Sequence, residues 1–228
     1  MPKPATPVVT DVDTPVGPAR LHAYRATSPR ALLVLGHGAG RGTDTDDLLG
    51  LARDLPGEGV AVVLVDQPWV LAGRKVAAPP PTLDVAWLAA VPAARKAVRA
   101  KASVPLVVGG RSAGARVACR TSVQLGAAGV LLLAFPLAPP SAKKDPSGSL
   151  AVRRAELAVP LDAGLPVVVA QGARDTFGGP DDVAAADPRA VVVAVAGADH
   201  GLKAPKSAPD PGPVLLGAAL DVVRLVGA

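Results

Sequence analysis

The feature that most constrains the fold of this chain is a series of short, continuous runs of apolar residues, rich in Val and Leu. Gly, Pro or Asp bounds these runs, and apolar residues do not alternate with polar ones inside them. Runs of this kind are typical of strands that are covered on both faces, as in a parallel sheet. The predicted strands are Ala31–Leu35, Val60–Val65, Pro105–Val108, Gly129–Phe135, Pro166–Ala170 and Ala190–Val195.

Longer segments with helical spacing lie between several of these runs. In one of them, Trp87, Val91 and Val98 can share a single helix face. Strand followed by helix, repeated along the chain, predicts a doubly wound, mostly parallel α/β sheet. The predicted helices are Asp46–Leu55, Leu83–Ala100, Ala113–Leu125 and Pro213–Val226.

The beginning of the chain has a different pattern. Val8–Val12 and Val16–Tyr24 flank Thr14–Pro15, which predicts an antiparallel hairpin ahead of the parallel strands. Two proline-rich stretches, Ala77–Pro81 and Ala138–Pro146, are predicted to be irregular, and the sequence leaves open the loops around 66–82 and 138–150. Because no linker or internal repeat divides the chain, we expect one domain over residues 1–228.

Composition narrows the possible partners. The chain is 50% hydrophobic and 19% charged, as in globular proteins, but only 2% aromatic, too few for stacking on bases. The net charge of +5 is spread along the sequence, and its one basic cluster, within residues 95–101, fits the solvated face of a helix. We therefore expect no nucleic-acid partner, and a monomer or small homo-oligomer.

Other features of the sequence indicate the cellular compartment and the need for cofactors. There is no apolar core of signal-peptide length near the start and no apolar stretch long enough to span a membrane. Cys119 is the single cysteine, which excludes an internal disulfide and is typical of a reducing compartment. Three histidines and one cysteine are also too few for a structural zinc site, so we expect no metal site and no cofactor. From the absence of a signal peptide and of a membrane span, we expect no membrane contact and a cytoplasmic location.

The strongest chemical signal is the segment Gly110-Arg111-Ser112-Ala113-Gly114, between a predicted strand and a predicted helix. A tight strand-to-helix turn holds a serine in a strained, exposed position, and the flanking glycines avoid collisions with the neighbouring strand and helix. Ser112 is therefore the candidate nucleophile. The alternative is a glycine-rich turn in which Ser112 has no role.

A serine hydroxyl needs a base, and the base needs an acid that fixes its tautomer. His200 follows the last predicted strand, at the sheet edge where ligands bind in open α/β folds. His22 lies in the hairpin and His37 in a glycine-rich segment, so His200 is the candidate base. Asp175, which follows the preceding strand, is the candidate acid, and Asp199 is its rival.

Serine chemistry also needs N–H donors for the oxyanion. The segment Gly36-His37-Gly38-Ala39-Gly40 follows the first parallel strand, where such donors are expected. We predict donors at Ala39 and Ala113, with Gly38 and Gly40 beside the substrate. A phosphate-binding loop is the alternative, but the segment lacks the Gly-Lys-Ser/Thr ending of such loops. Nor does a dinucleotide fingerprint follow that strand.

Three aromatic residues are candidate walls of the pocket. Trp69 lies in the loop after the second parallel strand, Phe135 ends another strand, and Phe177 follows Asp175 closely. We predict that all three contact the substrate, while ordinary loop packing is the alternative for Trp69.

The sequence resembles the α/β-hydrolase superfamily, and more narrowly its small members near the dienelactone hydrolases. These include a group related to a subunit of a eukaryotic histone-acetylating complex. The segments that carry the resemblance are His37-Gly38-Ala39-Gly40, Gly109-Gly110-Arg111-Ser112-Ala113-Gly114, Phe135-Pro136-Leu137, Gln171-Gly172-Ala173-Arg174-Asp175 and Ala198-Asp199-His200-Gly201-Leu202-Lys203.

The resemblance implies a single-domain α/β-hydrolase fold with little or no lid. It also implies a Ser112–Asp175–His200 triad and a backbone oxyanion hole near Ala39 and Ala113. Two residues depart from the pattern. Dienelactone hydrolases have a cysteine nucleophile where Ser112 stands, so their substrate does not carry over, and Ala113 is smaller than the residue often found after the nucleophile.

Together these observations predict a serine hydrolase that cleaves a small carboxylic ester or thioester through an acyl-enzyme. Two other functions stay open. One is a binding or scaffold module that keeps the fold without the chemistry, and the other is an acyltransferase with the same triad.

Overall fold

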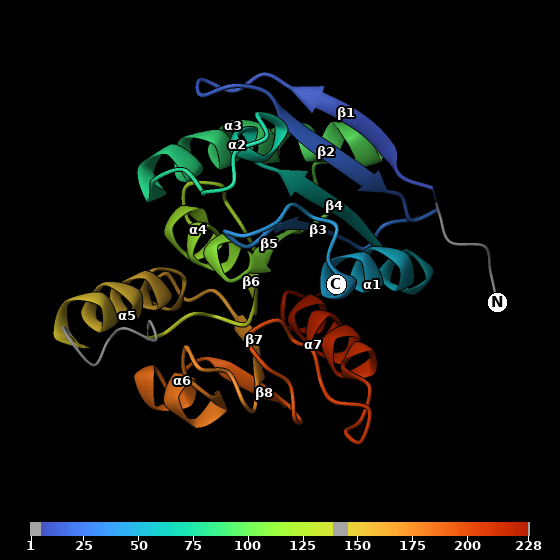
Figure 1. Ribbon diagram of the computed structural model, residues 1–228. Helices are drawn as coiled ribbons and strands as arrows, with labels where there is room; N and C mark the ends of the chain where they lie inside the picture. Colours follow the sequence, from blue (N-terminus) through green and yellow to red (C-terminus); the bar gives the residue numbers. More distant parts are fainter. Residues whose placement is uncertain (1–5, 139–145, 228) are drawn as a thin grey trace.

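The computed structural model describes residues 6–138 and 146–227, which form a single-domain α/β fold around one eight-stranded sheet (Figure 1). The strand order is β1-β2-β4-β3-β5-β6-β7-β8. The strands are β1 Val8–Val12, β2 Ala19–Tyr24, β3 Ala31–Gly36, β4 Val60–Asp66, β5 Leu106–Arg111, β6 Gly129–Leu133, β7 Val167–Gly172 and β8 Val191–Val195. Each predicted strand is present, which confirms the mostly parallel sheet.

The predicted N-terminal hairpin is also confirmed. β1 and β2 pair antiparallel, and the Gly17 N–H donates to the Thr14 carbonyl across the turn between them. β2 is antiparallel to β4 as well, whereas the pairs from β4 through β8 are parallel. Of the strands in the described residues, only β2 therefore runs against the others.

Helices cover both faces of the sheet. Figure 1 shows α1 and α7 on one side, and α3, α4 and α5 on the other. The helices are α1 Asp46–Asp54, α2 Pro68–Leu71, α3 Pro80–Val98, α4 Ala113–Thr121, α5 Pro146–Asp162, α6 Pro180–Ala186 and α7 Pro211–Leu225, and a 3-10 turn, η1, spans Leu55–Glu58. In the part of the chain that the structure describes, no helix combines the length and apolar character needed to cross a bilayer.

The two layers of helices explain why the strand runs do not alternate. Along β3, Leu32 and Val34 pack in one core with α3 and α4, while Leu33 and Leu35 pack in a second core with α1 and α7. A side chain on either face of such a strand is buried, so a polar residue has no favourable position in it. The predicted shared face of Trp87, Val91 and Val98 is likewise buried, in the first core.

One expectation about the connections needs correction, and a second falls mostly outside the described residues. The stretch Ala77–Pro81 was predicted to be irregular, but α3 begins inside it at Pro80, where a proline is favourable in the first helical turn. The second stretch, Ala138–Pro146, lies mostly in residues 139–145, outside the described residues, and helix α5 begins at Pro146. Residues 134–145 separate β6 from α5.

Helix α4 is joined to its neighbours by a partly buried ion-pair network. The Arg116 and Arg120 guanidinium groups of α4 both donate to the Glu156 carboxylate of α5, at 2.6 and 2.8 Å. Arg120 also donates to Asp84 of α3, at 2.6 Å. The three helices on this face are thus linked by charge as well as by apolar packing.

The sheet has its topological switch point between the carboxyl ends of β3 and β5. The chain leaves β3 toward α1 on one face and leaves β5 toward α4 on the other. Neighbouring strands whose connections depart to opposite faces leave an opening, which is the usual ligand site in open α/β sheets. Gly36–Gly40 and Ser112 both lie at this switch point.

Helix α4 reaches the switch point because backbone contacts backbone there. A Cβ on Gly110 would lie 2.6 Å from the Gly36 carbonyl oxygen, and one on Gly114 would lie 2.6 Å from the Gly36 carbonyl carbon. Real Cβ atoms do not approach backbone atoms so closely. This confirms the prediction that side chains at these two positions would collide with the neighbouring strand and helix.

We expect Gly114→Ala to lower the free energy of unfolding by about 1–3 kcal/mol, the usual cost of forcing an extra methyl group into a packed site. Gly217→Ala is the matched control, because it is also helical but nothing lies within 4 Å of the added methyl group. That control should stabilise the protein by up to about 1 kcal/mol through helix propensity. Urea unfolding measures both, and equal effects of the two variants would contradict the packing argument.

Candidate active site

Ser112 occupies the turn between β5 and α4 in an unusual backbone conformation. Its φ is 52° and its ψ is −108°, outside the regions that side chains normally allow. Its N–H donates to the Leu133 carbonyl of β6 at 2.9 Å, which anchors the turn to the next strand. The strain is thus held by the surrounding structure and presents the half-buried Ser112 side chain at the switch point.

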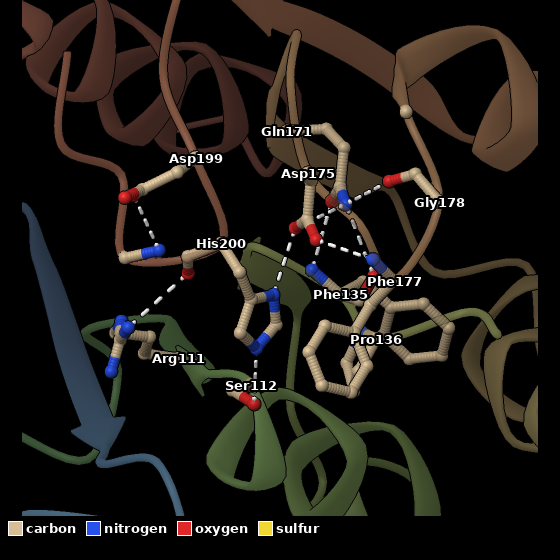
Figure 2. Close-up of polar contacts among 12 residues, drawn as sticks. Arg111, Ser112, Phe135, Pro136, Gln171, Asp175, Phe177, Gly178, Asp199 and His200 are labelled. Atoms are coloured by element: carbon tan, nitrogen blue, oxygen red, sulfur yellow. Dashed lines mark hydrogen bonds and ion pairs between the residues drawn. The ribbon is translucent and has the colours of Figure 1, made fainter. Parts of the chain in front are cut away.

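The three residues predicted as a triad lie in one hydrogen-bonded row (Figure 2). Ser112 Oγ lies 2.9 Å from His200 Nε2, and His200 Nδ1 lies 2.8 Å from Asp175 Oδ2. Because the Asp175 carboxylate can only accept, it places the His200 proton on Nδ1 and leaves Nε2 free to accept from the serine hydroxyl. The Asp175 side chain is fully buried, whereas that of His200 is 21% exposed.

The Asp175 carboxylate is held by further donors. Phe177 N–H donates to Oδ1 at 2.8 Å, and the Gln171 side-chain amide donates to Oδ2 at 3.0 Å. Gln171 is completely buried, and its amide also bonds both backbone groups of Phe135 and the Gly178 carbonyl. The sequence pattern assigned Gln171 no role, because its partners are backbone groups that only the fold brings together.

Asp199, the rival acid, points away from the imidazole. Its Oδ1 accepts from the backbone N–H groups of Gly201 and Lys203, at 2.8 and 3.1 Å. Figure 2 shows the Asp199 carboxylate on the side away from the His200 ring. It therefore stabilises the turn that follows His200, and Asp175 is the carboxylate that contacts the ring.

Arg111 links the His200 segment to the nucleophile turn. Its Nη2 donates to the His200 carbonyl at 3.2 Å, and its Nε lies 3.4 Å from Asp47 Oδ2 of α1. A Cβ on Gly38 would lie 3.1 Å from Nη1 of the same guanidinium. The side chain thus touches α1, the His200 segment and the loop after β3, a role that the sequence did not suggest.

The predicted oxyanion loop lies against the nucleophile turn. A Cβ on Gly38 would lie 3.6 Å from the Ser112 Cβ, and Ala39 and Ala113 line the same small cavity of about 10 Å³. Ala113 is the first residue of α4, where a backbone N–H has no partner within the helix. Gly40, also predicted beside the substrate, is exposed, with nothing within 4 Å of an added Cβ.

The three aromatic residues predicted as walls have different environments. The Phe177 ring lies on the His200 ring, with centroids 4.2 Å apart, at the triad itself. Trp69 is buried on α2, where it borders the small cavity beside Ala39. Phe135 is 0% exposed and packs in the core, and its contact with a substrate stays a prediction.

The remaining histidines are bound elsewhere. His22 Nε2 lies 2.9 Å from Asp66 Oδ2, in the hairpin region. His37 is buried, and its Nδ1 and Nε2 contact the Gly38 carbonyl and the Gln67 N–H, at 2.8 and 3.0 Å. Among the described residues, no three His, Cys, Asp or Glu side chains gather closely enough to hold a metal ion.

Cys119 lies on α4, far along the helix from Ser112, and is completely buried. Burial raises the pKa of the Cys119 thiol far above its usual range, so it stays protonated and unreactive. We expect a thiol reagent such as DTNB to label the native protein only at the slow rate of unfolding, and to label one thiol rapidly in denaturant. Rapid labelling under native conditions would contradict this burial.

Burial lowers the pKa of His37 below its ordinary value of 6.5, so the folded protein resists its protonation. The unfolded chain then binds more protons than the folded one, and stability attributable to His37 is lost as pH falls below 6.5. We expect the free energy of unfolding of the wild type, relative to His37→Asn, to decrease between pH 7 and pH 5 by at most about 1.4 kcal/mol per pH unit. A difference that is constant over this range would show that His37 titrates alike in both states.

The geometry on the sheet edge defines a class of site: a serine, histidine and aspartate in hydrogen-bonding order on a doubly wound sheet. Comparison with known proteins agrees with this class. Residues 29–222 match a family model described as an alpha/beta hydrolase domain, and the chain belongs to that family.

Solved structures share the whole fold at low sequence identity. An α/β serine hydrolase without a lid from Xanthomonas campestris is 18% identical, with a TM-score of 0.71, over 98% of this chain and 96% of that one. A serine hydrolase homologue from Coxiella burnetii is 16% identical, with a TM-score of 0.70, over 96% and 97%. A dienelactone hydrolase from Anabaena variabilis is 14% identical, with a TM-score of 0.65, over 96% of each chain. No curated protein sequence gives a significant match.

Proposed function

We propose that this protein is a serine hydrolase that cleaves a carboxylic ester or thioester through an acyl-enzyme. The observation that carries the proposal is the row from Ser112 Oγ through His200 to Asp175, with separations of 2.9 and 2.8 Å. Membership of the alpha/beta hydrolase domain family and the lid-less serine hydrolase from Xanthomonas campestris support the same class.

In the proposed reaction, Ser112 Oγ attacks the substrate carbonyl carbon while His200 Nε2 takes the hydroxyl proton. Asp175 keeps the imidazole in the required tautomer and stabilises the imidazolium that forms. The N–H groups of Ala39 and Ala113 stabilise the oxyanion. His200 then gives its proton to the leaving group, which departs as alcohol or thiol, and leaves an acylated Ser112.

The second half of the reaction regenerates the enzyme. Water attacks the acyl carbonyl while His200 Nε2 accepts its proton, and the carboxylic acid leaves as the proton returns to Ser112 Oγ. This order requires solvent to reach the acyl group, and the partial exposure of His200 supports such access.

A small acyl group is part of the proposal. Phe135 and Trp69 are buried, so Phe177 is the aromatic side chain, of the three, that lies against the triad. The connection between β6 and α5 is short, spanning residues 134–145, which supports an open site. We therefore expect kcat/KM for p-nitrophenyl esters to fall as the acyl group lengthens from acetyl to octanoyl.

Labelling and substitution test the chemistry. We expect a fluorophosphonate probe to modify Ser112, and Ser112→Ala to abolish both labelling and ester turnover while leaving the melting temperature nearly unchanged. Asp175→Asn should lower kcat by roughly 10⁴-fold, because the imidazole then loses its correct tautomer.

Asp199→Asn is the matched control for Asp175→Asn, because Asp199 adjoins His200 in sequence but contacts only backbone N–H groups. It should keep activity near that of the wild type. A folded wild-type protein that neither reacts with the probe nor turns over any ester in a broad panel would instead favour a non-catalytic binding module. Transfer of the acyl group to added alcohols or amines in preference to water would identify an acyltransferase.

A further inference from the structure

We infer that His37 is a positioning residue of this site: its neutral imidazole holds the Gly38 carbonyl and thereby directs the Ala39 N–H toward the carbonyl oxygen of a substrate bound at Ser112. The inference rests on the proposed function, since it concerns an oxyanion donor of that reaction. It assigns a role to the buried histidine that the triad does not use.

Two hydrogen bonds of the His37 ring indicate where its proton lies. The Gln67 backbone N–H can only donate, so the Nε2 atom that it contacts at 3.0 Å carries no proton. The Gly38 carbonyl can only accept, so the Nδ1 atom at 2.8 Å carries the proton. His37 is therefore neutral, in a single tautomer, and adding a proton to Nε2 would break the bond to Gln67.

The bond to Gly38 also determines the direction of the next N–H. The Gly38 carbonyl and the Ala39 N–H belong to one peptide group, and in a trans peptide these two groups point in opposite directions. The described backbone contains no cis peptide bond. With the Gly38 oxygen held toward the imidazole, the Ala39 N–H must point to the side away from His37.

The nucleophile turn lies beside this peptide group, and His37, Ala39 and Ala113 line one small cavity. A Cβ on Gly38 would lie 3.6 Å from the Ser112 Cβ, and Ala39 shares a cavity lining with Ala113, the other proposed donor. The orientation of one peptide group thus decides whether two N–H donors or one face the oxyanion.

The His37 imidazole is held in place by the residues around it. His37 is 4% exposed, and its ring makes an edge contact with the Trp69 ring at a centroid distance of 5.4 Å. The Gln67 side chain donates to the Leu83 carbonyl at 3.2 Å, so the residue that bonds His37 is itself bound to α3. A loop with glycine at 38 and 40 has little stiffness of its own, so it needs an external anchor of this kind.

Two isosteric variants separate the contacts of His37. In His37→Asn, the amide nitrogen takes the place of Nδ1 and can still donate to Gly38, while the acceptor for Gln67 is lost. In His37→Gln, the amide oxygen takes the place of Nε2 and can still accept from Gln67, while the donor to Gly38 is lost.

We expect kcat for p-nitrophenyl acetate to fall by roughly 10-fold or more in His37→Gln, with KM within about 3-fold, because a misdirected donor affects the transition state more than substrate binding. His37→Asn should recover most of that loss, although both variants lose the same ring contact with Trp69. Equal kcat values in the two variants, whether both high or both low, would overturn the inference.

The proton position provides a test that does not depend on activity. In the wild-type protein, nitrogen-15 NMR of the His37 ring should show a proton on Nδ1 alone. A proton on Nε2 would overturn the inference even if the variants fail to fold. Wild-type protein without esterase activity but with the Nδ1 proton would instead count against the proposed function.

Discussion

The site depends on a backbone contact between the start of α4 and the end of β3. Gly110 and Gly114 let these segments approach until an added Cβ would overlap Gly36. The contact sets the distance from Ser112 to the loop after β3, and so the position of the nucleophile relative to Ala39. The strain at Ser112, with its positive φ, is a consequence of the same tight turn. Packing of backbone on backbone, more than any side-chain contact, therefore fixes the geometry in which a carbonyl would be attacked.

The strands could be predicted because burial on both faces leaves a clear signal in the sequence. Helices such as α3 could be predicted because the residues of their single apolar face recur at helical spacing. Helix α5 was not, since its buried side includes the carboxylate of Glu156, which pairs with two arginines, and since Pro160 interrupts the pattern. A charged group buried against charges on another helix cannot be recognised from the periodicity of one segment.

The three triad residues could be proposed from sequence because each follows a predicted strand, and parallel strands end at one edge. The contacts of Gln171 and Arg111 could not, because both side chains bond backbone groups distant in sequence. Those of His37 could not either, because one ring nitrogen accepts from the distant backbone N–H of Gln67. The burial of Phe135, which the sequence did not indicate, has a local origin. Ala134 before it has a φ of 48°, which turns the chain at the end of β6, and the ring enters the core.

The ion-pair network of α4 has a consequence for how this sequence can diverge. Loss of Glu156 alone would leave the Arg116 and Arg120 guanidinium groups in a largely buried place without the carboxylate they share. Loss of either arginine would in turn leave the Glu156 carboxylate with one ion pair fewer. Replacing one of these residues therefore calls for a matching change in its partners. The helix that presents Ser112 thus carries a structural requirement that is unrelated to catalysis.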